Sequence, residues 1–168
     1  MKDCFKEWNA VIKALGQGEQ SVLIRKFTTF KEDFLLYPTV SYINKNNFMN
    51  DFQDKHKNLV EMNLLPKSEG KNVEIKYYAK IEKIKEFSPN ALSKYKDLFI
   101  WNTDHVKSYL ENKRGFIWLL RVYELENPVM GFAKPRAITF AKLAHDINVE
   151  AKQPVINDAE FDKILKKF

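Results

Sequence analysis

Gly115-Phe-Ile-Trp-Leu-Leu-Arg-Val-Tyr-Glu-Leu125, closed by Asn127-Pro128, is the most apolar stretch of the chain. Its apolar residues occupy both alternating faces, which is typical of a strand covered on each side. The stretch therefore predicts a central strand around which the rest of the fold is built. Arg121 lies in its middle, where an unpaired guanidinium would cost several kcal/mol, so we expect it to have a partner or to line a cleft.

Length and composition indicate one globular domain over residues 1–168, with 45% hydrophobic and 30% charged residues. The only cysteine, Cys4, excludes an internal disulfide. The sequence shows no signal-like apolar segment at its N-terminus and no apolar run long enough to span a membrane. We therefore expect a cytoplasmic protein with no membrane partner.

The net charge of +6 favours an anionic partner such as RNA or DNA. The lysines are spread along the chain and alternate with glutamates, which is equally typical of a solvated surface. The even spread keeps a second class open, a structural or interaction protein that forms a homodimer or binds a protein partner.

The first half of the chain shows helical and strand patterns in alternation. Asp3 is placed to cap a helix with apolar residues from Phe5 to Leu15, which ends at Gly16. Residues 21–27 and 34–38 read as two strands of a hairpin, the second ended or placed at an edge by Pro38. Apolar residues from position 48 to 60 fit one helix capped by Asn47.

The second half begins with a clear amphipathic strand over residues 73–84, in which one face is predicted to pack and the other to meet water or a ligand. Its apolar register slips at Lys83-Ile84. Helices are expected after Ser88-Pro89, after Thr103 and, from a capping-box pattern, after Asn157, while residues 137–148 fit a strand or a helix. Together these patterns predict an α+β fold, with a mixed, mainly antiparallel sheet or small pseudobarrel flanked by helices.

The sequence shows no motif that specifies an activity. His56, His105 and His145 are not at metal-ligand spacing, and no phosphate-binding loop, dinucleotide fingerprint or nucleophile elbow is present. We expect no cofactor and no metal, and the sequence leans against an enzyme.

One spacing resembles a catalytic motif. Glu74 and Lys76 share a strand face, as do the carboxylate and lysine of divalent-metal-dependent nucleases. The same spacing occurs on the wet face of any amphipathic strand, and no second acid stands out. The nuclease is therefore a further alternative, with Glu74 and Lys76 as weak catalytic candidates.

The leading hypothesis is a non-catalytic domain that binds nucleic acid or a nucleotide. Arg25, like Arg121, interrupts an apolar strand and suits an anion contact or an internal ion pair. Tyr78 lies on the predicted wet face between two lysines and suits base stacking. The predicted contacts are Arg25, Lys26, Lys76, Tyr78, Lys80 and Arg121.

Four stretches resemble a family of prokaryotic proteins catalogued only as a domain of unknown function: Glu7-Trp-Asn-Ala-Val-Ile-Lys-Ala-Leu-Gly-Gln-Gly-Glu-Gln20, Leu23-Ile-Arg-Lys26, Phe34-Leu-Leu-Tyr-Pro-Thr39 and Trp118-Leu-Leu-Arg-Val-Tyr-Glu-Leu125 with Pro128. The resemblance implies membership and no activity. The sequence departs from the family pattern at Phe27-Thr28, where two glycines are usual, and at Val40-Ser41-Tyr42, where a Glu-His-Gln-like segment is usual.

The order of the expected elements also resembles the small pseudobarrels of the PUA and EVE type. In those domains a strand like Tyr78-Ala-Lys-Ile-Glu-Lys-Ile84 precedes a helical segment and a return strand. This resemblance implies binding of RNA or modified bases in a cleft lined by aromatic and basic side chains.

Overall fold

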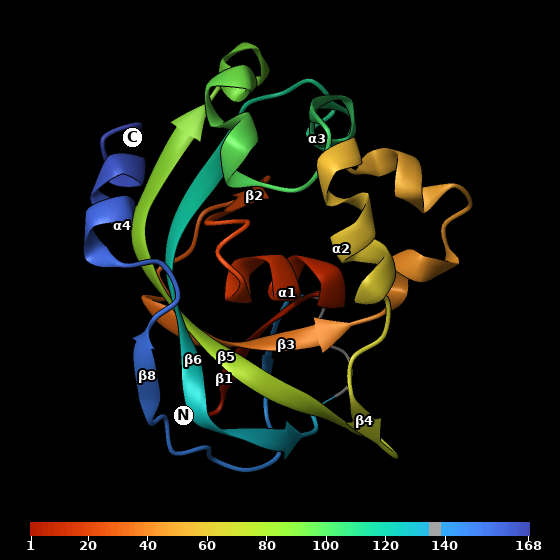
Figure 1. Cartoon of the computed structure of the whole chain (residues 1–168), viewed down its shortest axis with the longest axis vertical. Coiled ribbons are helices and arrows are strands. Elements are labelled where there is room, and N and C mark those ends of the chain that lie inside the picture. The colour runs from red at the N-terminus through yellow and green to blue at the C-terminus, as the bar shows by residue number, and fades with distance from the viewer. Residues whose placement is uncertain (135–138) are drawn as a thin grey trace.

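The computed structural model describes residues 1–134 and 139–168 and shows a curled sheet with helices packed against it (Figure 1). The strands are β1 Asp3–Trp8, β2 Val22–Arg25, β3 Asp33–Thr39, β4 Ser68–Glu69, β5 Asn72–Phe87, β6 Gly115–Gly131, β7 Phe140–Lys142 and β8 Ala151–Pro154. The α-helices are α1 Asn9–Gly16, α2 Lys57–Met62, α3 Thr103–Tyr109 and α4 Asp158–Leu165, and the 3-10 helices are η1 Ser41–Asn44, η2 Phe48–Asp51, η3 Asp54–His56 and η4 Pro89–Leu98.

The predicted central strand is confirmed as β6. It pairs antiparallel with β5 along most of its length, and β2 and β8 also bond to it. Both faces of β6 are covered, with Trp118 and Leu120 in one core cluster and Ile117 and Leu119 in another. This two-sided burial explains the continuous apolar run.

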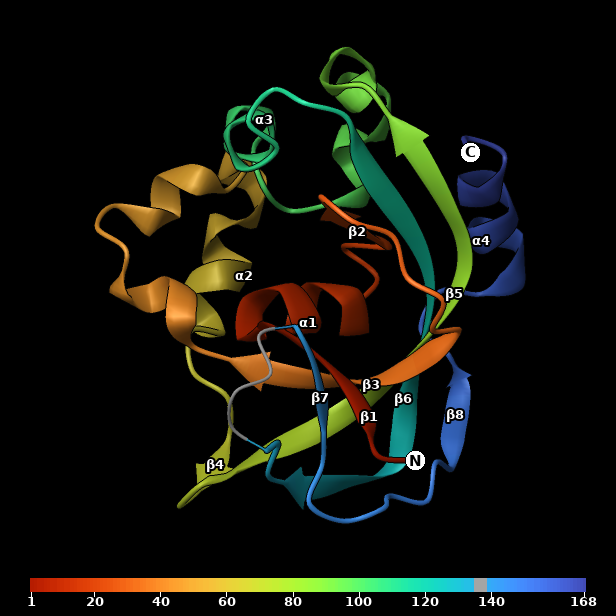
Figure 2. The ribbon, with the colours of Figure 1, turned by 180° about the vertical axis from the view of Figure 1, so that it is seen from behind.

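The predicted α+β class with a mixed, mainly antiparallel sheet is also confirmed. The strand order is β2-β6-β5-β3-β1-β7, and the pair β1–β3 is parallel. Beyond β6 and β7 the chain closes on itself, since Ala133 bridges Leu143 and the amide of Ala144 donates to the carbonyl of Phe132 at 3.0 Å. One end of the sheet is therefore a small pseudobarrel, with β7 beside β1 in the view from behind (Figure 2).

The pseudobarrel interior is filled by side chains from β1, β3, β5 and the closing segments, among them Cys4, Leu35, Ile75 and Leu143. Burial raises the pKa of the Cys4 thiol to about 11, so it is an inert core group. A second core cluster lies on the other side of the sheet, where α1 packs across it.

The N-terminal helix predicted from Asp3 is wrong in its first half. Asp3–Trp8 forms β1, and the helix begins only at Asn9. Cys4 faces the pseudobarrel and Phe5 faces the α1 side, so apolar residues are needed on both strand faces. The spacing of Phe5 and Trp8 fits a helix as well, and the pairing with β3 and β7 decides for the strand.

The predicted hairpin of the next two strands is also wrong. β2 pairs with β6, whereas β3 pairs with β5 and β1. Pro38 lies inside β3, opposite Glu7 of β1, and does not end the strand. The intervening segment carries the chain from one side of the sheet to the other, which local turn signals cannot show.

Several helix predictions need correction. The single helix expected after Asn47 is two short 3-10 helices, η2 and η3, followed by α2, because Asn47 itself adopts a left-handed φ of 56° and Phe52 bridges to Trp101. The helix after Ser88 is a 3-10 helix with no side-chain cap, and the cap before α3 is Asn102 instead of Thr103.

The predictions for the C-terminal part of the chain agree better with the structure. Asn157 caps α4 by accepting from the amide of Glu160, as predicted. Residues 137–148 were predicted to form either a strand or a helix. The structure shows a strand at Phe140–Lys142, and residues 137 and 138 lie outside the described part. The register slip predicted in β5 is found between Ile81 and Lys83.

Candidate functional site

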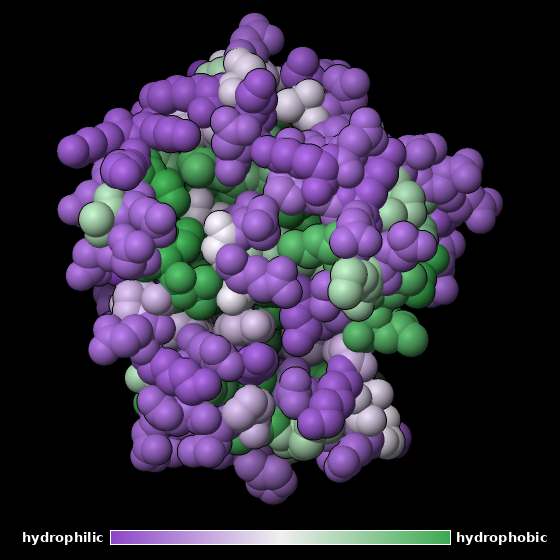
Figure 3. Space-filling view, in the orientation of Figure 1, coloured by the Kyte–Doolittle hydropathy of each residue, from purple (hydrophilic) through white to green (hydrophobic). Residues whose placement is uncertain are grey.

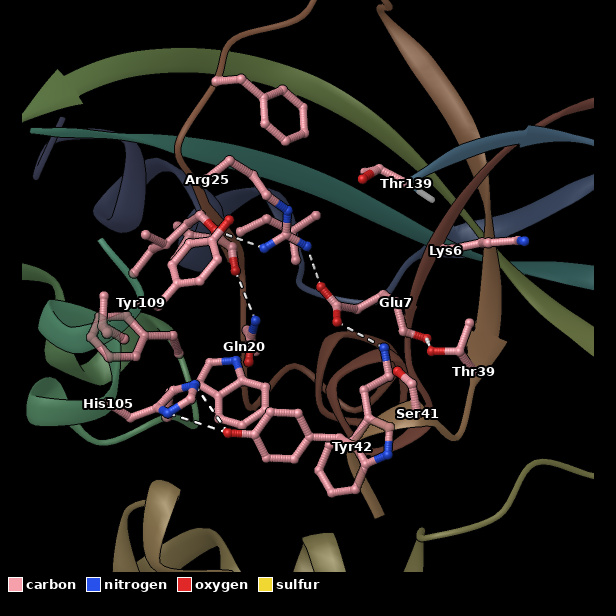
Figure 4. A pocket seen from close by; sticks show the side chains of 18 residues that line it. Lys6, Glu7, Gln20, Arg25, Thr39, Ser41, Tyr42, His105, Tyr109 and Thr139 are labelled. Atoms are coloured by element: carbon pink, nitrogen blue, oxygen red, sulfur yellow. Dashed lines mark hydrogen bonds and ion pairs between the residues drawn. The ribbon is translucent and has the colours of Figure 1, made fainter. Parts of the chain in front are cut away.

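A cavity of about 600 Å³ opens at the C-terminal end of β1, between β2 and the helices η1 and α3 (Figure 4). Its volume lies in the range of small-molecule sites, about 300–1,000 Å³. Five segments that are distant in the sequence supply its walls, within residues 6–8, 20–27, 39–42 and 99–109 and at Thr139. The side chains that matter below are Glu7, Arg25, Tyr42, Trp101, His105 and Tyr109.

One wall carries an ion pair. Arg25, the last residue of β2, donates to Glu7 of β1 and to its own neighbouring carbonyl at Ile24, the latter at 2.6 Å. The second carboxylate oxygen of Glu7 accepts from the amide of Trp8 at 2.7 Å. The Arg25 guanidinium also lies 4.9 Å over the ring of Phe5.

Both members of this pair keep some contact with solvent, at 15% exposure for Arg25 and 14% for Glu7. Figure 4 shows both side chains beside the open centre of the cavity. The pair therefore presents a donor and an acceptor to a ligand without a net charge.

The opposite wall is aromatic. Trp101 stacks on His105 with ring centres 4.7 Å apart and an interplanar angle of 28°. Tyr42 meets Trp101 edge to face at 4.9 Å, and Trp8 lies 5.3 Å from Tyr42. These rings give the cavity a broad apolar surface of the kind on which a planar ligand stacks.

Hydrogen bonds fix this wall from behind. The hydroxyl of Tyr42 donates to Asp51 at 2.5 Å and lies 3.2 Å from His105 Nδ1, and Lys45 reaches the same carboxylate at 2.5 Å. Burial and then the hydrogen bond to Asp51 raise the pKa of Tyr42 far above its usual value. Burial lowers the pKa of His105.

The pKa of the Asp51 carboxyl shifts in the opposite direction to that of Tyr42. Burial alone would raise its pKa, but hydrogen bonds from Lys45 and Tyr42 hold the pKa of Asp51 below its usual value. At neutral pH the cluster thus holds a protonated tyrosine, a charged aspartate and a neutral histidine. This arrangement suits a rigid wall better than a nucleophile.

The structure places one predicted contact residue in the lining of this cavity and a second beside one of its lining rings. Arg25 lines it, and Lys26 lies over the ring of Tyr109 at 5.4 Å while pairing with Glu111 at 2.5 Å. Lys45 occupies the equivalent place over Tyr42, also at 5.4 Å. Two lysines therefore lie over two rings of the cavity wall.

The other four predicted residues, Lys76, Tyr78, Lys80 and Arg121, do not line this cavity. Tyr78 does not lie on a wet face as predicted: it is buried in the pseudobarrel and donates to Asp33 at 2.8 Å. The strand alternation is correct, but both faces of β5 are covered at this point. Lys80 is exposed over the ring of Tyr123, 5.9 Å from its centre.

Arg121 has a partner, as expected for a guanidinium in a buried strand. It pairs with Asp158 at the start of α4 and lies 4.3 Å over the ring of Phe161. Only 6% of Arg121 is exposed, and the space around it leaves no room for a water molecule. This arginine joins α4 to the sheet.

Glu74 and Lys76, the candidates for a metal-dependent nuclease, each have a separate ion-pair partner. Glu74 pairs with Lys67 at 3.2 Å, and Lys76 pairs with Glu124 at 3.1 Å, a contact that raises the pKa of Lys76. Among the residues that the structure describes, no group of three or more histidine, cysteine, aspartate or glutamate side chains is placed to hold a metal ion.

Sequence reasoning missed Glu7, Tyr42 and His105 as site residues. Glu7 begins the longest stretch of the family resemblance, which was the one available signal. Tyr42 and His105 meet only through the tertiary fold, since 63 positions separate them.

The fold and this cavity define an α+β domain with a curled sheet and an aromatic pocket. The chain belongs to the family described as a domain of unknown function, DUF1802, whose pattern matches residues 4–167. The membership predicted from the sequence is thereby confirmed. No curated protein matches the chain. Within the described residues, none of the helices has the length and apolar character to cross a membrane.

Three similar solved structures are of an ASCH protein from Zymomonas mobilis. The first has 16% identity and a TM-score of 0.47, with 99% of this chain and 80% of the other covered. Two mutant proteins of the same ASCH protein also have TM-scores of 0.47, at 15% identity with 99% and 82% covered, and at 16% identity with 98% and 94% covered.

Proposed function

We propose that the aromatic pocket binds an unpaired base of a single-stranded nucleic acid, without cleaving it. The observation that carries this proposal is the combination of stacked rings and a paired donor and acceptor around one cavity. Stacking of a base on an aromatic side chain contributes about 1–3 kcal/mol and needs no particular sequence. The Arg25–Glu7 pair would then meet the polar edge of the stacked base.

The lysines at the two rings suit the phosphates on either side of such a base. Lys26 and Lys45 each lie over a ring of the pocket, at 44% and 50% exposure. The Lys26–Glu111 ion pair is exposed on both sides and is of the kind that contributes about 0–1 kcal/mol, while Lys45 is the exposed member of its pair with Asp51, which is 19% exposed. Replacing such a carboxylate partner by a phosphate therefore costs little free energy. The net charge of +6 acts in the same direction.

Binding of labelled single strands at low salt tests the proposal. We expect RNA or DNA nonamers to bind more tightly than a duplex of the same length, with an affinity that falls as salt increases. Tyr109→Ala should weaken binding, whereas Phe30→Ala, which removes a fully exposed ring outside the pocket, should not. Equal binding of duplex and single strand would contradict the proposal.

The nuclease alternative is separated in the same samples. We expect the nonamers to be recovered intact after incubation with magnesium or manganese. Cleavage that stops with a chelator or with Glu74→Gln would favour the nuclease instead.

A protein-binding role has its own observation. Met62 and Leu65, at and just beyond the C-terminal end of α2, are 75% and 67% exposed. Figure 3 shows an apolar patch beside this end of α2 on a face that is otherwise mostly polar. A homodimer that dissociates with Met62→Lys in light scattering would support this second candidate. A monomer at high concentration would count against it.

A further inference from the structure

We propose that the Arg25–Glu7 pair makes the pocket selective for guanine. This inference rests on the proposed function and names the base that the same pocket takes. It follows from the donors and acceptors that the pair presents to the cavity.

The pair has hydrogen-bonding capacity beyond its internal contacts. A carboxylate accepts about four hydrogen bonds, and each oxygen of Glu7 receives one, from Arg25 and from the Trp8 amide. A guanidinium has five N–H donors, and two of its bonds go to Glu7 and to the Ile24 carbonyl. A ligand in the cavity therefore meets a donor from Arg25 beside two acceptor oxygens of Glu7.

Guanine matches this order along its edge. Its O6 accepts, and its N1–H and N2–H₂ both donate, so O6 would face Arg25 while the two donors face the carboxylate. Adenine and cytosine each place a ring-nitrogen acceptor beside their amino group, and that lone pair would face the carboxylate. Uracil has a single N–H between two carbonyls.

Charge supports a base edge over a phosphate at this position. The Arg25 guanidinium is already neutralised by Glu7 within the cavity, so the pair has no excess positive charge. A phosphate group would also lie against the carboxylate, which repels it. Lys26 and Lys45 are also paired with carboxylates, but at 44% and 50% exposure their ammonium groups reach solvent, where a phosphate can approach from the side away from the partner.

Uridine nonamers with one central substitution test the inference on the unchanged protein. We expect central guanine to bind on the order of tenfold tighter than adenine or cytosine, the size of one good bidentate contact. Inosine, which lacks only the N2 amino group, should fall between them. Equal affinities for guanine and adenine would overturn the inference, whereas failure of every nonamer to bind would overturn the proposed function itself.

Glu7→Gln supplies the second test, because it keeps the shape of the side chain and replaces an acceptor by a donor. We expect the ratio of the guanine affinity to the adenine affinity, both measured on this variant, to fall from about tenfold to about one. The matched control is Glu111→Gln, which changes the partner of Lys26 and should keep the guanine preference.

Two further measurements test the selectivity for guanine without depending on the folding of the Glu7 variant. If Glu7→Gln does not fold, the comparison of guanine with inosine on the unchanged protein decides. A pterin has the same acceptor and donor edge on a free bicyclic ring, so we include it as a competitor. Tighter binding of the pterin than of guanosine monophosphate would overturn the assignment to guanine.

Discussion

Two arginines interrupt apolar strands in this fold, and their surroundings share three features. Arg25 in β2 pairs with Glu7 and lies 4.9 Å over Phe5, while Arg121 in β6 pairs with Asp158 and lies 4.3 Å over Phe161. Each thus has a carboxylate partner, an aromatic ring and a strand backbone around it. Under the proposed function, the two arginines nevertheless have different roles.

The difference is the space in front of each side chain. A cavity of about 600 Å³ lies before Arg25, whereas α4 covers Arg121 and leaves no room for water. An ion pair that borders a cavity can offer hydrogen bonds to a ligand, whereas the buried guanidinium of Arg121 joins β6 to α4 through a carboxylate at the surface. Cavity volume, which only the tertiary structure shows, is what distinguishes the surroundings of Arg25 from those of Arg121.

The largest expected effect is a loss of stability when the aromatic ring that covers Arg121 is removed. Phe161 is 6% exposed, and Phe161→Ala should lower the free energy of unfolding by about 3–5 kcal/mol. The control is Phe27→Ala, which removes a ring that is 38% exposed at the pocket and should cost less than about 1 kcal/mol. Chemical denaturation measures both, and equal losses would break the distinction between the two regions.

Binding should show the opposite pattern. Arg25→Met should lower the affinity for the guanine-containing nonamer on the order of tenfold, because it removes a charged donor at the base edge. Arg121→Met should leave that affinity within about twofold, because its side chain does not border the cavity. Fluorescence anisotropy with folded protein measures both, and a similar loss in the two variants would show that binding depends on the fold as a whole.

The sequence predicts that the two arginines need compensation, but it does not predict which residues compensate them. Arg25 and Arg121 could be selected because a lone charge in an apolar strand is visible in the sequence and must be compensated. Their partners could not, since Asp158 is 37 residues from Arg121 and Glu7 is 18 residues from Arg25. The fold class and the central strand were predictable from period and composition, because these reflect burial directly.

Tyr78 shows the limit of alternation. A strand with Glu, Lys and Tyr on one face reads as half exposed, yet the pseudobarrel covers Tyr78 while Lys76 and Lys80 stay nearer to solvent. The same closure explains β1, whose two apolar faces read as a helix. In both cases the missing information is the curl of the sheet, which brings Ala133 and Leu143 together in a bridge.

His56 is a third basic side chain in the interior, and unlike the two arginines it can lose its proton near neutral pH. His56 is buried, with Nδ1 3.7 Å from Glu19 and with its Nε2 lacking a hydrogen-bond partner within the described residues. Burial, then Lys55, lower the pKa of His56 against the smaller opposing effect of Glu19. Unlike either arginine, this side chain is stable in the fold as the neutral form.

The lowered pKa of His56 determines how the stability of the fold changes with pH. Below about pH 6.5 the unfolded chain binds a proton that the folded chain resists, so the free energy of unfolding should fall, by at most about 1.4 kcal/mol per pH unit for one group. The loss begins below pH 6.5 and is complete below the lowered pKa. His56→Gln should reduce this slope between pH 7 and 5, and adding His105→Gln should reduce it further, because burial lowers that pKa also. An unchanged slope in the double variant would assign the pH dependence to other groups.

The smallest effect is expected on the outer face of the sheet, and it decides whether that face contacts nucleic acid at all. Each lysine that neutralises a phosphate of a single strand adds about 0.7 to the slope of log affinity against log salt. Lys76 is paired with Glu124 and Lys80 lies over Tyr123, both away from the pocket, so Lys76→Ala with Lys80→Ala should leave the slope unchanged. Lys26→Ala with Lys45→Ala should lower it by about 1.4. A slope that falls in the first pair and not in the second would move the interface to the face around β5 and leave the pocket without a role in nucleic-acid binding.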